Sequence, residues 1–286
     1  MKNPKYLLYL VVVIVILSTL VSLVGLLSDA PSEQTTVTSI YGETIALYGK
    51  GIYHNDSKAV AAQGIASDLV TLILGIPLLI ASSYYALRGS FRGQLLMTGT
   101  LAYFLYTYIS YTFLWMYNPL FIVYVILMSA SLYAFILMML SFNLSELPKR
   151  YDERLPIKFL GGFQIFIAVA IGLLWLGKIG DAFTSGNPPL GLEHYTTLVI
   201  QGMDLGIVVP TAFFSGISLL RKKPIGYLLS SIIIIKGITM LTAITAMILN
   251  TLLSGIQVSL VEGILFPGFN LLAIFSLILL MKHVKS

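Results

Sequence analysis

The chain has 286 residues, of which 57% are hydrophobic and only 10% are charged. A soluble domain carries about 25% charged residues, so the composition excludes an ordinary water-soluble protein and indicates one that lies in the lipid bilayer. The absence of cysteine excludes disulfides, thiolate metal sites and thiol catalysis.

Eight apolar segments along the chain are each close to the ~20 residues that cross a hydrocarbon core. In chain order they lie near residues 6–27, 67–87, 94–116, 119–141, 158–177, 196–219, 225–249 and 259–281. The sequence therefore predicts one all-α integral membrane domain over residues 1–286, a polytopic transmembrane bundle of about eight helices.

The first segment has a second interpretation. Lys2 and Lys5 precede it and Ser28-Asp29-Ala30 follows it, as in a cleaved signal peptide. The apolar stretch of about 22 residues is longer than the ~7–15 of a signal core, and Pro31 would follow the cut directly. We therefore predict that this segment is retained as a helix.

The largest loop, residues 28–66, is predicted to lie on the outer side. Residues 35–40 are rich in β-branched side chains, Tyr41-Gly42-Glu43 is typical of a turn, and residues 44–48 can return as a second strand. We expect a small β-hairpin here, docked on the helix ends because an isolated hairpin is marginal in water.

Basic residues gather in five loops and tails, which alternate with loops that hold only Lys50, Lys58 and Lys178. The five clusters are Lys2 and Lys5; Arg88 and Arg92; Lys149, Arg150, Arg154 and Lys158; Arg221, Lys222 and Lys223; and Lys282 and Lys285. An even number of spans puts all five on one side, which the positive-inside rule assigns to the cytoplasm. We therefore expect a multi-pass cell-membrane protein with both termini in the cytoplasm. The same rule explains the net charge of +5 without a nucleic-acid partner.

A shift of 133 residues partly superimposes the second half of the sequence on the first, with eight identities in the 25 positions from 72 to 96. They include Pro77 with Pro210, Ser82 with Ser215, Arg88 with Arg221, and Gly93 with Gly226. A duplication predicts two four-helix halves of the same orientation, residues 1–142 and 157–286. Coincidence between two ordinary transmembrane hairpins is the alternative.

Ionisable side chains inside the membrane are costly and usually have partners, so they are the first candidates for a site. At ~1.5 Å per helical residue, Lys236 lies ~20 Å, Asp204 ~25 Å and Asn270 ~18 Å from the inner boundary. Glu262 lies near the outer edge, at ~30 Å. We predict a buried Lys236–Asp204 pair with Asn270 hydrogen-bonded nearby; an ion pair that only fixes helix register is the rival interpretation.

Polar residues also match between the halves. The shift pairs Asp68 with Gln201, Thr71 with Asp204, and Tyr103 with Lys236. Small and hydroxyl side chains line ordinary helix contacts in membranes, so packing explains part of this pattern. The candidate binding residues are Asp204, Lys236, Asn270, Gln201, Asp68, Glu262 and Tyr103.

Other chemistry is sparse. His54, Asp56, Glu193 and His194 are predicted to lie on the outer side and are weak candidates for a divalent metal site, although their spacing matches no metal motif. There is no phosphate-binding glycine loop and no nucleophile elbow. The sequence therefore assigns no catalytic residue, and the cofactor is unknown.

Several stretches resemble a family of prokaryotic multi-pass membrane proteins of unassigned activity. They are Leu47–Tyr53, Asp68–Thr71 with Pro77, Arg88–Gly93, and His194–Thr197 with Asp204. The likeness runs over most of the chain and implies the same multi-pass architecture. It implies no activity and no site residues.

The leading functional hypothesis is transport or permeation of an unidentified small molecule or ion, near Asp204, Lys236 and Asn270, between two helical halves. One alternative is an intramembrane enzyme for a lipid-like substrate, with Asp204 or Glu262 in acid–base work. The other is a sensor, assembly factor or subunit that binds a membrane partner, or a second copy of the chain, through the outer hairpin.

Overall fold

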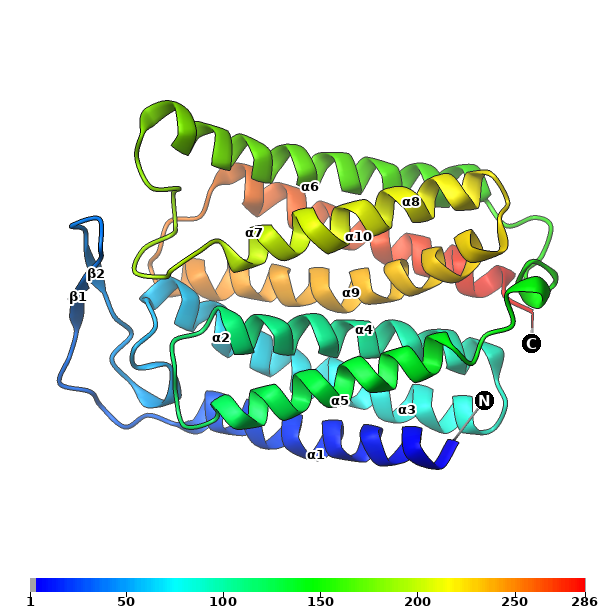
Figure 1. Cartoon of the computed structure of the whole chain (residues 1–286), viewed down its shortest axis with the longest axis horizontal. Coiled ribbons are helices and arrows are strands. Elements are labelled where there is room, and N and C mark those ends of the chain that lie inside the picture. Colours follow the sequence, from blue (N-terminus) through cyan, green and yellow to red (C-terminus); the bar gives the residue numbers. More distant parts are fainter. Residues whose placement is uncertain (1–3, 286) are drawn as a thin grey trace.

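The computed structural model describes residues 4–285 as a bundle of helices that run lengthwise. A small β-hairpin lies at one end of the bundle, and α1 begins and α10 ends at the other (Figure 1). We call these the hairpin end and the terminal end.

The helices fall into two sets, which we call the first half and the second half. The first half contains α1 (Pro4–Leu27), α2 (Lys58–Val70), the π-helical turn η2 (Thr71–Gly75), α3 (Ile76–Leu87), α4 (Phe91–Phe113) and α5 (Phe121–Met139). The second half contains α6 (Ile157–Ser185), α7 (Val199–Met203), the π-helical turn η4 (Asp204–Val208), α8 (Val209–Leu220), α9 (Pro224–Leu253) and α10 (Leu260–His283).

The predicted all-α polytopic bundle is confirmed. Within residues 4–285, seven helical segments are long and apolar enough to cross a membrane, with α2 continuing through η2 into α3 and α7 through η4 into α8. The eighth predicted span, α4, is 23 residues long but rich in Thr and Tyr. It packs against α3, α5 and α9, and most of its side chains are buried. A central helix can therefore be more polar than one that faces lipid.

The outer surface of the bundle is apolar. On α1, a stripe at every fourth residue (Leu8, Val12, Ile16 and Leu20) is exposed, whereas Leu7, Val11, Ile14 and Val21 are buried. Residues four apart lie on one face of a helix. An exposed apolar stripe of this length fits contact with lipid.

The predicted hairpin is present. Strands β1 (Thr36–Thr38) and β2 (Thr44–Ala46) pair antiparallel, with Val37 opposite Ile45. The turn between them closes where the Ser39 amide donates to the Glu43 carbonyl at 2.8 Å. Gly42 adopts a φ of +83° in this turn, a conformation that glycine adopts without a steric penalty.

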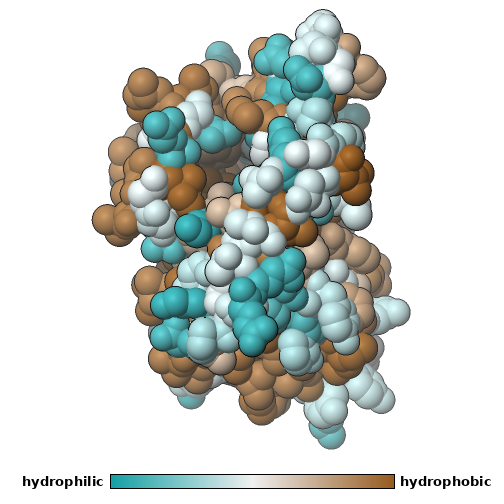
Figure 2. Space-filling model, turned by 90° about the vertical axis from the view of Figure 1, so that its left-hand side faces the viewer, coloured by the Kyte–Doolittle hydropathy of each residue, from teal (hydrophilic) through white to brown (hydrophobic). Residues whose placement is uncertain are grey.

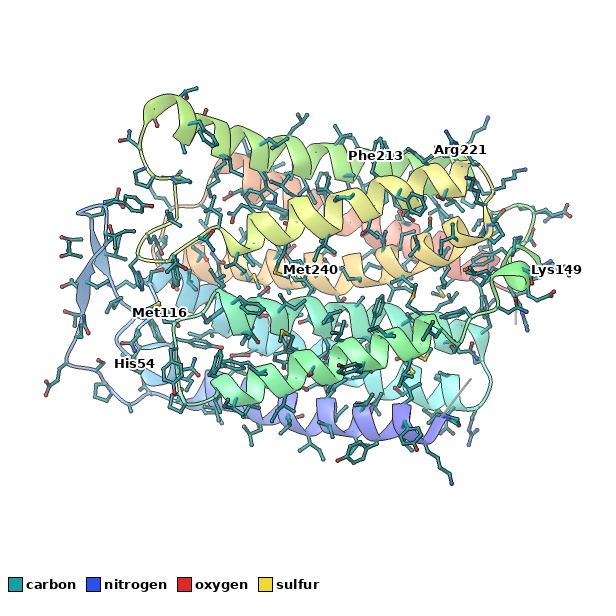
Figure 3. All side chains as sticks on the ribbon, viewed as in Figure 1. His54, Met116, Lys149, Phe213, Arg221 and Met240 are labelled. Carbon is teal, nitrogen blue, oxygen red and sulfur yellow. The ribbon has the colours of Figure 1, made fainter. Side chains whose placement is uncertain are left out.

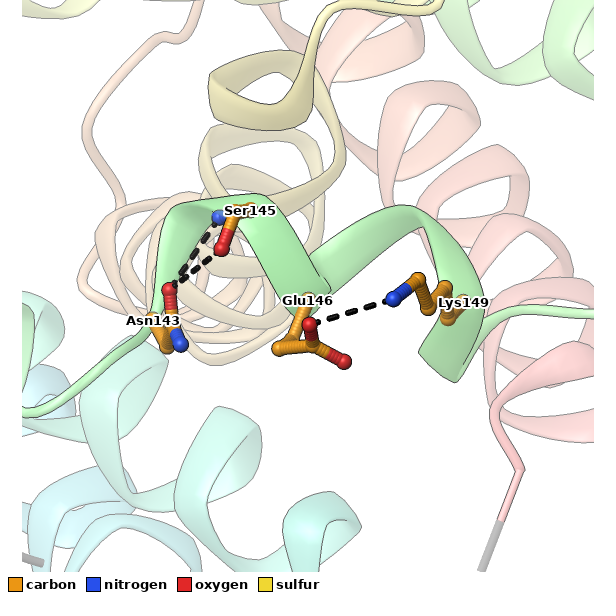
Figure 4. A network of polar contacts seen from close by, with 4 residues as sticks. All are labelled: Asn143, Ser145, Glu146 and Lys149. Atoms are coloured by element: carbon orange, nitrogen blue, oxygen red, sulfur yellow. Dashed lines mark hydrogen bonds and ion pairs between the residues drawn. The ribbon is translucent and has the colours of Figure 1, made fainter.

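The terminal end carries the basic connections. Lys149 and Arg221 lie at this end and His54 and Met116 at the other (Figure 3). The 3₁₀ helix η3 (Leu144–Arg150) joins the halves. It begins where the Ser145 amide and hydroxyl donate to Asn143 Oδ1 at 3.3 and 2.8 Å, and Lys149 pairs with Glu146 at 3.2 Å (Figure 4).

The helix breaks recur at the same interval as the sequence matches. The starts of η2 and η4, of α3 and α8, and of α4 and α9 are each 133 residues apart (71 and 204, 76 and 209, 91 and 224). Pro77 and Pro210 follow the π-helical turns directly. Proline lacks an amide hydrogen and clashes with the carbonyl four residues earlier, which explains a widened turn at this point in both halves.

The halves differ in how their outermost helices meet. In the first half, α1 packs directly on α5. In the second half, α6 packs on α8 and α10 on α9, but along the described helices the backbones of α6 and α10 do not approach closely. They meet through the edge-to-face pairs Phe159–Phe275 and Phe166–Phe269, with ring centroids 5.5 and 5.8 Å apart. The separation leaves room inside the second half.

Candidate functional site

A cavity of about 1040 Å³ occupies this space. Its walls come from α6, α7 with η4, α9 and α10, and also from α2 and α4 of the first half. Figure 2 looks onto the hairpin end and shows a hollow in the part formed by the second half. The volume is at the upper end of the ~300–1,000 Å³ typical of ligand sites.

Asp204 lies in the cavity wall at the first residue of η4 and is half-buried. The Tyr106 hydroxyl donates to Asp204 Oδ1 at 2.8 Å, and Trp175 Nε1 donates to Oδ2 at 2.9 Å. Tyr106 belongs to α4 and Trp175 to α6, so the carboxylate links the two halves. Each oxygen therefore already accepts one strong hydrogen bond.

Lys236 also lines the cavity, and its ammonium nitrogen lies 4.1 Å from the centre of the Tyr106 ring. This distance is within the range of a cation–π interaction. In the part of the chain that the structure describes, the ammonium makes no hydrogen bond and no ion pair shorter than 4.0 Å. The predicted Lys236–Asp204 pair thus takes an indirect form, in which Tyr106 contacts Lys236 with its ring and Asp204 with its hydroxyl.

Two residues of this arrangement escaped the sequence-based selection. Tyr106 falls too deep in its helix for the membrane-interface belt, and this depth was the available signal. Trp175 gave no signal, because a tryptophan near the end of an apolar segment is ordinary in membrane helices.

The structure separates the other candidates. Gln201 and Glu262 line the cavity with Asp204 and Lys236. Asn270 is not among the lining residues; it accepts a hydrogen bond of 3.3 Å from Thr242 Oγ1 at the contact of α9 with α10. The prediction that Asn270 bonds near the charged pair is therefore wrong.

Asp68 and Tyr103 lie apart from the cavity, in the closed first half. Asp68 is 1% exposed and accepts hydrogen bonds from the hydroxyls of Tyr53 at 2.6 Å and Tyr111 at 2.9 Å. A side chain at Gly25 would clash with its carboxylate. The Tyr103 hydroxyl is 2.8 Å from Thr71 Oγ1. These residues form a packed internal network and are not open to a solute.

The cavity ends towards the terminal end in buried polar residues. Ser215 Oγ donates to Gln164 Oε1 at 2.7 Å and lies 3.0 Å from Ser230 Oγ. Gln164 also lines the cavity. Beyond it lies a packed apolar cluster that includes Leu160, Leu219 and Leu228, which are at most 1% exposed. The cavity is therefore open at the hairpin end and sealed at the terminal end.

A second junction joins the halves at the hairpin end. The Met116 amide and the Tyr195 hydroxyl each donate to Asp56 Oδ1 at 3.0 Å. Burial raises the pKa of Asp56 to about 7, and the nearby charge of Glu193 raises it further, although both hydrogen bonds lower it. His194 Nε2 donates to the Asn55 carbonyl at 3.0 Å.

The candidate metal ligands do not form a metal site. Asp56, Glu193 and His194 come near one another, but His54 Nδ1 bonds the Gly51 carbonyl at 2.8 Å. Across residues 4–285, no group of three or more His, Cys, Asp or Glu side chains is placed to hold a metal ion. The metal hypothesis is wrong for this arrangement.

No protein-family model matches the chain, and no curated protein or solved structure matches it. The functional argument therefore rests on the cavity and its residues.

Proposed function

We propose that the chain is a membrane transport or permeation protein whose solute enters the cavity at the hairpin end and binds at the Asp204–Tyr106–Lys236 arrangement. One observation carries this proposal: a large cavity reaches two ionisable side chains deep in the bundle, and both halves contribute to its wall. Ionisable groups at such depth typically mark a solute pathway.

The arrangement of the halves supports this proposal. Their π-helical turns and proline-started helices recur at 133 residues, and we propose that they are repeats of the same orientation. Transporters built from such repeats bind their solutes near the midplane at the repeat interface. Tyr106 of the first half meets Asp204 of the second at such an interface.

The basic loops support a direction. They lie at the terminal end, where Lys149 and Arg221 are found (Figure 3). By the positive-inside rule we propose that this end faces the cytoplasm and that the cavity opens to the outside of the cell membrane. Passage then requires that the seal around Gln164, Ser215 and Ser230 opens in a second conformation.

Cysteine labelling tests this proposal directly, because the chain has no cysteine of its own. Gln201→Cys places a thiol in the cavity wall and Ser230→Cys places one beyond the seal. A membrane-impermeant maleimide should modify Gln201→Cys from the hairpin side. It should modify Ser230→Cys from the terminal side, more slowly, because that side opens only transiently.

The matched control is Leu127→Cys, which is 0% exposed in the closed first half and should stay unmodified from both sides. If Ser230→Cys is as inert as Leu127→Cys from the terminal side, no second opening exists and the transport proposal fails. If Gln201→Cys is inert from both sides, the cavity is sealed and the proposal fails as well.

A further inference from the structure

The Lys236 ammonium has three donor hydrogens, and within residues 4–285 none reaches an acceptor. Its one close neighbour is the face of the Tyr106 ring, at 4.1 Å. A buried cation without an acceptor is costly. The side chain is half-buried and lines the cavity, so a group inside the cavity can reach it.

Asp204 does not fill this need. Its two oxygens accept from Tyr106 at 2.8 Å and from Trp175 at 2.9 Å, and these bonds hold the carboxylate against α4 and α6. The carboxylate is fully engaged while the ammonium is not. The cavity therefore lacks an acceptor or an anion and does not lack a donor.

The rest of the wall is mainly apolar. Residues that line it above and around the two charges include Phe163, Ile167, Ile171 and Leu174 of α6 and Leu241 and Ile244 of α9. Such a surface favours an apolar ligand body. A small hydrated inorganic anion would leave most of the ~1,000 Å³ unfilled by its own contacts.

We propose that the cavity binds an organic anion with an apolar body, its anionic group on the Lys236 ammonium and its body against the α6 and α9 wall. The ligand class rests on the proposed solute site. The Tyr106 ring under the ammonium and the Asp204 carboxylate behind Tyr106 hold the cation in place until the anion arrives. A cationic ligand of the same shape would meet the Lys236 charge without a counterion.

Thermal unfolding of the purified protein in a neutral detergent tests the class with three isosteric probes: 4-butylbenzoate, 4-butylbenzamide and 4-butylbenzylammonium. A ligand that binds only the folded state raises the melting temperature by mass action. We expect a rise of about 5 °C with the benzoate at saturating concentration, and little change with the amide or the ammonium compound.

The variant Lys236→Met should lose this rise, with at least tenfold weaker benzoate binding. Lys58→Met is the matched control, because Lys58 is an exposed lysine at the hairpin end outside the cavity wall, and it should keep the rise. An equal rise with benzoate and benzylammonium, or a rise that survives in Lys236→Met, overturns the proposal. The probe comparison on the wild-type protein decides the matter even if Lys236→Met does not fold.

The anion can come from water or from a lipid headgroup, and a second arm separates these sources. The protein is melted in phosphatidylcholine nanodiscs with and without phosphatidic acid. A rise with phosphatidic acid alone that Lys236→Met abolishes supports the anion site and assigns it to a lipid, whereas a rise with 4-butylbenzoate assigns it to a free acid. No rise with either probe overturns the proposal. The cysteine labelling uses no ligand, so failure of the anion class leaves the transport proposal separately testable.

Discussion

In the first half, the helix that bends at Thr71 meets α4 through a neutral hydrogen bond between Thr71 and Tyr103, inside a closed four-rod unit. In the second half, the equivalent bend begins at Asp204, and the residue that corresponds to Tyr103 is Lys236. There the rods α6 and α10 are held apart, and a cavity reaches both charges.

The comparison indicates that one backbone plan can serve as a packed unit or as an open site. Direct packing of α1 on α5 fills the first half, so its polar groups must satisfy one another. Separation of α6 from α10 lets the second half keep charged groups that face a cavity. Buried charges without water or partners would be too costly in the first half.

The largest effect should come from the packed half. Asp68→Ala removes the acceptor of two buried phenols, Tyr53 and Tyr111. Each unsatisfied donor costs ~1–3 kcal/mol, so we expect a loss of ~4 kcal/mol in the free energy of unfolding. Gln201→Ala, at the equivalent position in the cavity wall, should lose less than ~0.5 kcal/mol. Unfolding both variants in one detergent measures the difference, and equal losses would contradict the contrast between the halves.

The junction between the halves should depend on pH. The pKa of Asp56 is raised from 3.8 to about 7 in the folded protein, so its contribution to stability is full below pH 4 and is lost as the pH rises through 7. Each pKa unit corresponds to ~1.4 kcal/mol, so the loss amounts to a few kcal/mol. Melting temperatures between pH 4 and 8 should fall in the wild type and stay flatter in Asp56→Asn.

The matched control for this pH series is Asp29→Asn, a carboxylate at the hairpin end that is 77% exposed in its pair with Lys50. Its melting temperatures should follow those of the wild type. A slope in Asp56→Asn equal to the wild-type slope would place the pH dependence on another group.

A smaller effect should be shared by the two halves. A methyl group on Gly93 would lie 2.6 Å from the Ala86 amide nitrogen, and one on Gly226 would clash with the Leu219 amide nitrogen at the equivalent turn. We expect Gly93→Ala and Gly226→Ala to lose similar amounts, ~2 kcal/mol each, from overpacking. Gly162→Ala on α6, where a methyl group meets open space, should be neutral or slightly stabilising. Clearly unequal losses at the two turns would argue against equivalent hairpins.

The smallest expected effect separates two tyrosine hydroxyls. Tyr103→Phe removes a buried hydrogen bond to Thr71 and should cost ~1 kcal/mol. Tyr106→Phe removes the bond to Asp204 at the cavity, where water can replace the hydroxyl, so its cost should be smaller. Melting of both variants tests the order, and a larger loss at Tyr106 would show that the cavity is drier than its opening suggests.

The sequence by itself determined the helical spans, the hairpin in the loop 28–66, the clustering of basic loops and the positions of the two helix breaks. These features follow from local hydrophobicity, turn residues and proline, which act within a few residues of the chain. The sequence also identified Asp204 and Lys236, because a charge in an apolar run is conspicuous without any knowledge of its neighbours.

Only the tertiary structure decided what these charges do. Tyr106 lies between Lys236 and Asp204, Trp175 holds the second carboxylate oxygen, and Asn270 bonds elsewhere. The sequence also could not distinguish the packed Asp68 from the cavity residue Gln201, although they occupy equivalent positions. The physical reason is that a cavity arises from the distance between helices such as α6 and α10, which depends on side-chain packing across the whole bundle.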